Sequence, residues 1–262
     1  MGGSKSDGTV LATVSAYTAS TNSWTTKASL PAARQTGNGA VDINSIIYLA
    51  GGHDASLALT RTLYAYNSST NTWSTKAPMP AFSSCGDSGV IGGKIYVFSG
   101  CTRSSTGGQI AAGLLHRYDP STNAWTTLRT TPASHGQPVV GANSGKLYVV
   151  GGNNESGVAT GRVDMYDPAT NTWSTKAAMP TARVGAAGTS IGGKLHIFGG
   201  RNGTTYLSTV VAYDPLTNSW SSRASMPTAR AALGVAGVSG YLYAVGGRNI
   251  TGVLATNERY TP

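Results

Sequence analysis

The sequence predicts an all-β fold made of a repeated four-stranded unit, and three recurring residues predict it. The five tryptophans stand 47 to 52 residues apart, a tyrosine lies seven residues before each, and a proline lies seven residues after each. A Gly-Gly pair, or its variant Ser99-Gly100, follows each proline by about twenty residues. The tryptophans are Trp24, Trp73, Trp125, Trp173 and Trp220.

Each unit contains the signals of four short antiparallel strands. The first strand follows the proline, and the second, such as residues 94–98, is apolar at consecutive positions and therefore buried on both faces. The Gly pair ends the second strand, the third strand ends at the tyrosine, and the fourth carries the tryptophan after a Pro- and Asn-containing turn. One such sheet cannot bury both faces alone, so we expect the units to pack as the blades of a β-propeller, with Tyr and Trp between blades.

The order Gly-Gly, Tyr and Trp at a period near 50 resembles the Kelch repeat, and residues 165–173 resemble bacterial members of that family. The resemblance covers nearly the whole chain and implies a single Kelch propeller domain over residues 1–262. A count of 21 strands favours five four-stranded blades, with six as the alternative. We expect the N-terminal Trp24 strand to close the last blade, which leaves the strand of Tyr17 or Tyr260 redundant. The chain is then a monomer or a strand-exchanged homo-oligomer.

Charge and composition narrow the range of partners. The net charge is +9, which favours anionic partners, but the 19 Lys and Arg are scattered, so we expect no nucleic-acid binding. No apolar stretch approaches the roughly 18 residues of a membrane span, and we expect no membrane partner. No leader precedes the first strand, so the compartment is unknown, although few lysines among many Ser, Thr and Gly slightly favour a secreted protein. Two cysteines without clustered histidines make no zinc site, and we expect no metal and no cofactor.

Two sets of equivalent positions predict a ligand site. In an antiparallel hairpin the start of the first strand lies beside the end of the second, so both sets should gather at one end of the propeller, near its channel. The first set lies three residues after each proline and consists of Arg34, Ser83, His135, Arg183 and Arg230. The second set follows each Gly pair and consists of His53, Cys101, Asn153, Arg201 and Arg248.

Five arginines at one end favour an anion, because a guanidinium holds carboxylate, sulfate or phosphate by two-point contacts. Kelch adaptors of ubiquitin ligases contact acidic peptides with the arginine of the first set, and this resemblance implies ligand contact at Arg34, Arg183 and Arg230. The leading hypothesis is a non-catalytic binding module for an acidic peptide or an acidic glycan. Its ligand site would also include Arg201, Arg248, His53, His135, Asn153 and Ser83. In the alternative interpretation the arginines only cap backbone carbonyls.

Two other function classes stay open. The likeness to sialic-acid mutarotases, which also use a Kelch propeller, implies an enzyme on acidic sugars, although the sequence shows no acid–base set that matches theirs. From the residues alone, His53 or His135 with Asp54 or Asp87 could serve as acid and base. A truncated or engineered scaffold without a ligand is the third hypothesis. The copper chemistry of Kelch-type galactose oxidases is not expected, because no tyrosine occupies either set.

Three further features carry smaller predictions. Cys85 and Cys101 face each other if Gly92-Gly93 is the hairpin turn, so a disulfide is possible; the alternative is two separate small core residues. His196 stands where the other second strands have tyrosine and should be packed in the core. The longest connection within a unit runs from Cys101 to about Leu114 through the Gly/Ser-rich residues 104–108, and it is either a lid over the site or a plain flexible loop.

Overall fold

The computed structural model describes residues 1–35, 37–103 and 109–262, and it divides into two compact units. Unit 1 comprises residues 1–110 and 116–127, and unit 2 comprises residues 111–115 and 128–262. Every helix or strand in the described residues is a β-strand, which confirms the all-β prediction. None of them is a helix able to cross a membrane. Segment 104–108, for which a lid was an expectation, lies outside the described residues.

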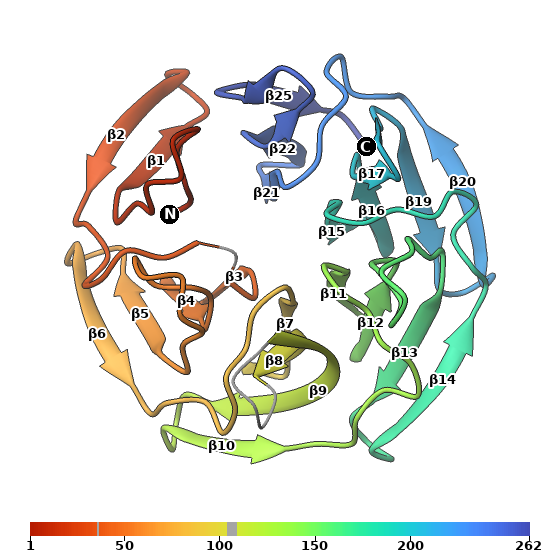
Figure 1. Ribbon diagram of the computed structural model, residues 1–262, viewed down its shortest axis with the longest axis horizontal. Coiled ribbons are helices and arrows are strands. Elements are labelled where there is room, and N and C mark those ends of the chain that lie inside the picture. Colours follow the sequence, from red (N-terminus) through yellow and green to blue (C-terminus); the bar gives the residue numbers. More distant parts are fainter. Residues whose placement is uncertain (36, 104–108) are drawn as a thin grey trace. The chain divides into compact units, whose positions relative to one another are not determined.

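Unit 1 holds three sheets, drawn in red to yellow-green in Figure 1. The first sheet pairs β1 (Val14–Thr18) with β2 (Ser23–Lys27). The second has the order β3 (Ala40–Ile43), β4 (Ile46–Ala50), β5 (Leu63–Asn67) and β6 (Thr72–Lys76). The third has β7 (Asp87–Ile91), β8 (Lys94–Arg103), β9 (Gln109–Asp119) and β10 (Ala124–Thr127). Residues 111–115 of β9 belong to unit 2.

Unit 2 repeats the same sheet, drawn in green to blue in Figure 1. Its first sheet has the order β11 (Val139–Asn143), β12 (Lys146–Val150), β13 (Val163–Asp167) and β14 (Thr172–Lys176). The next has β15 (Ala187–Ile191), β16 (Lys194–Phe198), β19 (Val210–Asp214) and β20 (Ser219–Arg223). The last has three strands, β21 (Gly234–Val238), β22 (Tyr241–Val245) and β25 (Asn257–Tyr260).

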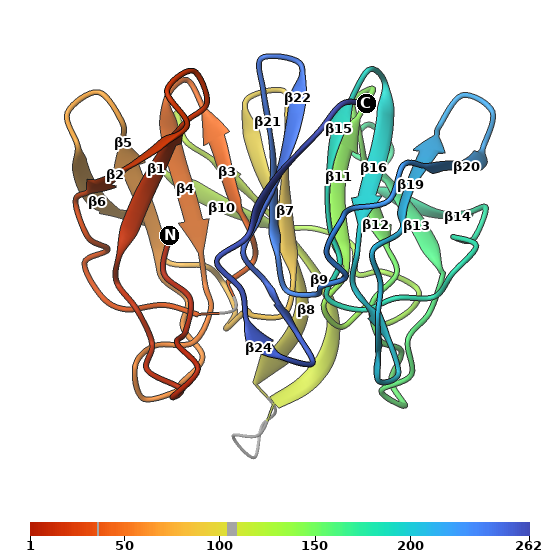
Figure 2. The same ribbon diagram turned by 90° about the horizontal axis from the view of Figure 1, so that it is seen from above.

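Two short hairpins follow second strands in unit 2. One consists of β17 (Arg201–Asn202) and β18 (Thr205–Tyr206), and the other of β23 (Arg248–Asn249) and β24 (Gly252–Val253). Figure 2 shows the β24 hairpin at the opposite end of its sheet from the turn that joins β21 to β22. Each hairpin begins at a residue of the predicted second set, so these residues stand on rigid backbone.

The repeated tryptophans join neighbouring sheets within each unit, as the sequence predicted. Trp73 Nε1 donates to the carbonyl of Ala28 at 2.8 Å in unit 1, and Trp220 Nε1 donates to the carbonyl of Ala177 at 2.9 Å in unit 2. Trp125 and Trp173 make the equivalent bonds to residues 77 and 129. Each indole also packs on the tyrosine opposite it, with ring centroids 4.9–5.1 Å apart in these four sheets.

The core of each unit lies between its sheets. In unit 1, Tyr48, Leu63, Met79, Ile95 and Tyr118 form one fully or largely buried cluster. In unit 2, Val139, Val163, Leu195, Ile197 and Tyr213 form the corresponding cluster. Both faces of the second strands are covered, which explains their apolar residues at consecutive positions.

The strand number matches the sequence, but the expected closure does not form. Leaving aside four two-residue strands, the described residues form 21 strands, enough for the five predicted blades with one strand over. Four sheets have four strands each, and the other five strands form a two-stranded sheet in unit 1 and a three-stranded sheet in unit 2. β25, the Tyr260 strand, takes the third place beside β22, and β2, the Trp24 strand, pairs with β1 and not with β25.

A conservative change tests the tryptophan link. Trp220→Phe keeps an aromatic ring but leaves the carbonyl of Ala177 without its donor, so the free energy of unfolding should fall by about 1–2 kcal/mol. Trp24 is 48% exposed, so Trp24→Phe should change stability by no more than about 0.5 kcal/mol. Urea unfolding of both variants measures the difference. Equal losses would contradict the two-stranded pairing of β2.

Candidate functional site

The two predicted sets of side chains meet at the same end of each sheet. Isolated β-bridges join the residue after each member of the first set to a member of the second set. The bridges are Gln35 with His53, Ser84 with Cys101, Gly136 with Asn153, Val184 with Arg201, and Ala231 with Arg248. The hairpin argument from the sequence is therefore confirmed, but the two sets differ in exposure.

The first set is buried. His135, Ser83 and Arg230 are 0% exposed, Arg183 is 1% exposed and Arg34 is 7% exposed. Arg183 Nη1 donates to the carbonyls of Gly199 at 2.9 Å and Thr209 at 3.1 Å, so it ties the second strand to the third. This geometry matches the carbonyl-capping alternative, and ligand contact at Arg34, Arg183 or Arg230 would require the side chain to leave the interior.

In three sheets the buried first-set residue also bonds to the side chain that lies two residues before the repeat tyrosine. Arg34 Nη2 donates to the hydroxyl of Tyr64 at 3.2 Å, and Arg230 Nη2 donates to Glu258 at 3.1 Å. His135 Nε2 lies 2.9 Å from Asp164 Oδ2. Sequence reasoning missed Asp164 and Glu258. An acidic residue at this one position, in repeats whose first-set residue is cationic, is the signal that could have found them.

His135 takes the buried position that arginine holds in three other sheets. Its Nδ1 lies 2.8 Å from the carbonyl oxygen of Gly151, and its Nε2 lies 2.9 Å from a carboxylate oxygen of Asp164. Each ring nitrogen thus has a hydrogen-bond acceptor of its own sheet as neighbour. A ring with both nitrogens occupied and 0% exposure cannot act as the acid–base residue that the sequence allowed.

The charges of this network are strongly held. Burial raises the pKa of Asp164, but hydrogen bonds from His135, Arg162 and Thr175 outweigh burial and hold that pKa at about 2. Burial lowers the pKa of Arg183 to about 10, so its guanidinium stays charged at neutral pH. The charged guanidinium of Arg183 therefore links the second and third strands of its sheet at neutral pH.

The second set forms an exposed row in unit 2. Gly185 N donates to the carbonyl of Gln137 at 3.1 Å, and Ala232 N donates to the carbonyl of Gly185 at 2.7 Å. Gln137, Gly185 and Ala232 each directly follow the first residue of one β-bridge. Their hydrogen bonds therefore hold the three bridges side by side. The second-set residues of those bridges are Asn153, which is half-buried, and Arg201 and Arg248, which are exposed. We call them the Asn153–Arg201–Arg248 row.

One carboxylate lies beside this row. Glu155 is exposed on the turn that follows Asn153, and its Oε1 accepts a hydrogen bond from Ser134 at 3.2 Å. The turn is shaped by Asn154, whose Oδ1 accepts from the amides of Ser156 and Val158 at 3.0 Å. The row supplies two guanidinium groups and an amide, and Glu155 adds a solvent-exposed carboxylate beside Asn153.

The remaining predicted residues lie in unit 1. His53 is half-buried and bridges both Gln35 and Leu59 through its backbone. Asp54 accepts hydrogen bonds from the Ser56 hydroxyl and from the amides of Ser56 and Ala58, and these bonds lower its pKa. Its carboxylate thus shapes the turn.

Cys85 and Cys101 are both thiols in this structure, which matches the alternative of two separate residues. Cys101 pairs through its backbone with Ser84, in the register that the β7–β8 hairpin sets from its Gly92-Gly93 turn. Cys85 therefore lies one position away from the residue opposite Cys101, and it adopts a left-handed conformation with φ of 53°. No group of three or more His, Cys, Asp or Glu able to hold a metal occurs among the described residues.

His196 lies where the sequence placed it, within the core. It is 3% exposed on β16, and its ring centroid lies 6.2 Å from that of Tyr260. Burial first, and then the nearby charges of Arg223 and Lys194, lower its pKa. A neutral, packed ring at this position fits its role as a substitute for tyrosine.

Comparisons with known proteins give both fold and family. A family model described as the KLHDC2/KLHL20/DRC7 Kelch-repeats domain matches residues 1–177 and 88–260. A solved structure titled "Structure of YjhT" superposes with a TM-score of 0.78 at 18% identity, covering 92% of this chain and 85% of that one. The predicted Kelch-type β-propeller fold is confirmed by these matches.

Curated relatives point to an enzyme. N-acetylneuraminate epimerases of Escherichia coli strain K12 and Shigella sonnei strain Ss046 are 36% identical over 70 residues, 26% of this chain. That match spans 19% of the length of those relatives. Their name contradicts the leading hypothesis of a non-catalytic binding module and favours the alternative of an enzyme on acidic sugars.

The buried pair predicts a stability change in acid. The pKa of Asp164 is lower in the folded state than its ordinary 3.8, so its stabilisation is complete above pH 4 and is lost as pH falls through 2. The loss attributable to Asp164 should be about 2 kcal/mol. Urea unfolding of the wild type and Asp164→Asn between pH 2 and 6 measures it. The stability difference should shrink as pH falls, and a constant difference would contradict the assignment.

Proposed function

The chain belongs to the Kelch-repeat family, and from that premise we propose that it is an enzyme acting on a carboxylated sugar, as an N-acetylneuraminate epimerase does. The exposed pair Arg201 and Arg248, on neighbouring hairpins of unit 2, is the observation that carries the proposal. A sugar carboxylate is a group that guanidinium side chains bind through two-point, charge-assisted hydrogen bonds.

The row supplies complementary contacts for such a sugar. Arg201 Nη1 already donates to the carbonyl of Gly203 at 2.9 Å, which restrains its side chain while other N–H groups stay available. Arg248 begins the next short hairpin, so its backbone is equally restrained. The amide of Asn153 both donates and accepts, which suits a sugar hydroxyl.

Glu155 is the acid–base residue of this proposal. Inversion at the anomeric carbon opens the ring: the base removes the anomeric hydroxyl proton, a carbonyl forms, and the ring C–O bond breaks as its oxygen gains a proton. Closure on the other carbonyl face reverses these transfers. A single exposed carboxylate can accept the first proton and return it to the ring oxygen. The reaction is an isomerisation, so it needs no oxidant and no second substrate.

The arginines should control substrate binding. Arg201→Ala and Arg248→Ala should each raise KM for N-acetylneuraminate about tenfold or more, because each removes one charge-assisted contact with the carboxylate. NMR exchange spectroscopy of the two anomers measures the rate. Arg129→Ala, another exposed arginine of unit 2, is the matched control and should leave KM unchanged. A wild-type protein that does not exceed the buffer rate would refute the proposal.

Glu155 should control the chemical step. Glu155→Gln keeps the size and the acceptor oxygen but cannot take a proton, so kcat should fall about 100-fold with KM nearly unchanged. The same exchange experiment reports both constants. An unchanged kcat would remove Glu155 from the mechanism while leaving the arginine prediction intact.

A further inference from the structure

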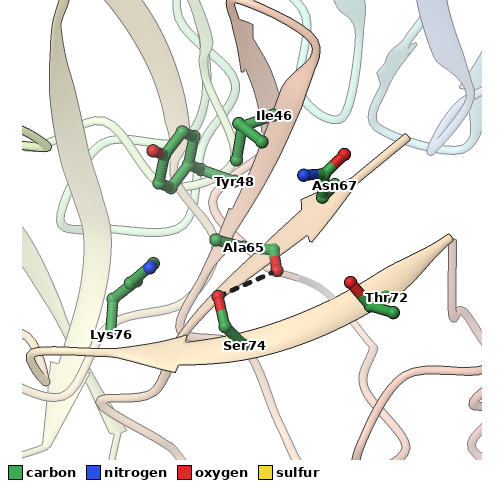
Figure 3. Close-up of a pocket in the computed structure, with 7 residues that line it drawn as sticks. All are labelled: Ile46, Tyr48, Ala65, Asn67, Thr72, Ser74 and Lys76. Carbon is green, nitrogen blue, oxygen red and sulfur yellow. Dashed lines mark hydrogen bonds between the residues drawn. The ribbon is translucent and has the colours of Figure 1, made fainter. Parts of the chain in front are cut away.

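Unit 1 contains a small cleft on the face of the sheet β3–β6. Its volume is about 230 Å³, below the roughly 300–1,000 Å³ of sites for drug-sized ligands. Figure 3 shows the side chains around it, which come from β4, β5 and β6. They are Ile46, Tyr48, Ala65, Asn67, Thr72, Ser74 and Lys76.

The cleft exists because this sheet lacks an ion pair that three other sheets have. In those sheets a lysine at the start of the second strand binds an aspartate at the end of the third. The pairs are Lys94–Asp119, Lys146–Asp167 and Lys194–Asp214. Here Ile46 and Asn67 occupy the two positions, so neither charge is present.

A small side chain opens the space further. Ala65 stands opposite Tyr48, and the equivalent residue of the sheet β11–β14 is Met165, opposite Tyr148. The missing methionine atoms leave room between the strands. The apolar part of the lining consists of Ile46, Ala65 and the ring of Tyr48.

The polar groups around the cleft favour a negative charge. Lys76 brings an ammonium group, and no ion pair to it occurs among the described residues. Asn67 Oδ1 accepts from the amides of Ser69 and Thr70, which leaves its NH₂ group as a donor. Burial raises the pKa of Tyr48, so its hydroxyl keeps its proton. The nearest acid on the inner strands, Asp42, pairs with Ile47 and so belongs to the other face.

We propose that this cleft binds a small carboxylate anion, with Lys76 supplying the charge and Tyr48 supplying a hydrogen bond. The aliphatic part of the anion lies against Ala65 and Ile46. With one cation and so little buried area, the dissociation constant is about millimolar. This site is independent of the proposed enzymatic function, because none of its residues belongs to the row in unit 2.

Acetate is the probe, and its neutral isostere acetamide is the matched control ligand. We expect acetate, titrated at constant ionic strength into the ¹⁵N-labelled full chain, to shift the amide signals of residues 65–76 saturably, while acetamide does not. Lys76→Gln should weaken binding at least tenfold. Lys176→Gln, the same position in the sheet β11–β14, should leave it unchanged.

Two further variants separate the site from general charge effects. Ala65→Met should fill the cleft and abolish binding, and the double variant Ile46→Lys, Asn67→Asp should do the same by restoring the ion pair of the other sheets. The second variant guards against a packing defect in the first. Acetate shifts that persist in Lys76→Gln or in the double variant, or equal shifts with acetamide, would overturn the proposal.

Discussion

The fold depends on a buried nitrogen-bearing side chain near the start of a sheet's first strand, which bonds to the strands beside it. Arg34, Arg183, Arg230 and His135 all occupy this position, and each is hydrogen-bonded to carbonyls, a hydroxyl or a carboxylate inside its own sheet. Replacing one member of a buried, charged hydrogen-bonded pair lowers the free energy of unfolding by several kcal/mol, because the other member is left without its partner. The arginines that look most like ligand contacts in the sequence are therefore part of the framework.

This framework leaves the second set for function. The backbone alternates, so a residue bridged beside a buried cation presents its side chain to the other side. In unit 2 the chain of hydrogen bonds through Gly185 holds three such residues together. Arg201 and Arg248 are both exposed and follow neighbouring bridges, which supports the proposed binding of a carboxylated sugar. In unit 1, small departures from the repeat, at Ile46, Ala65 and Asn67, open a separate cleft.

Much of the architecture could be predicted because the repeat offsets are fixed. The four strands of each unit, the Tyr–Trp pairs and the meeting of the two sets at one end all follow from those offsets. Counting residues left two partners open for Cys85, and the structure selects the register in which Ser84 faces Cys101. The closing strand was not predicted correctly because β2 stays paired with β1 in a local hairpin, and a periodic pattern cannot tell that pairing from one with β25.

The sequence by itself determined the fold class, the strand number and the positions that carry charge. Periodicity encodes these features locally, since each depends on residues a few positions apart. Only the tertiary structure decided which charged side chains are inside and which reach solvent. That choice depends on partners from other strands, such as Asp164 for His135 and the carbonyl of Thr209 for Arg183, and no spacing within one strand records them.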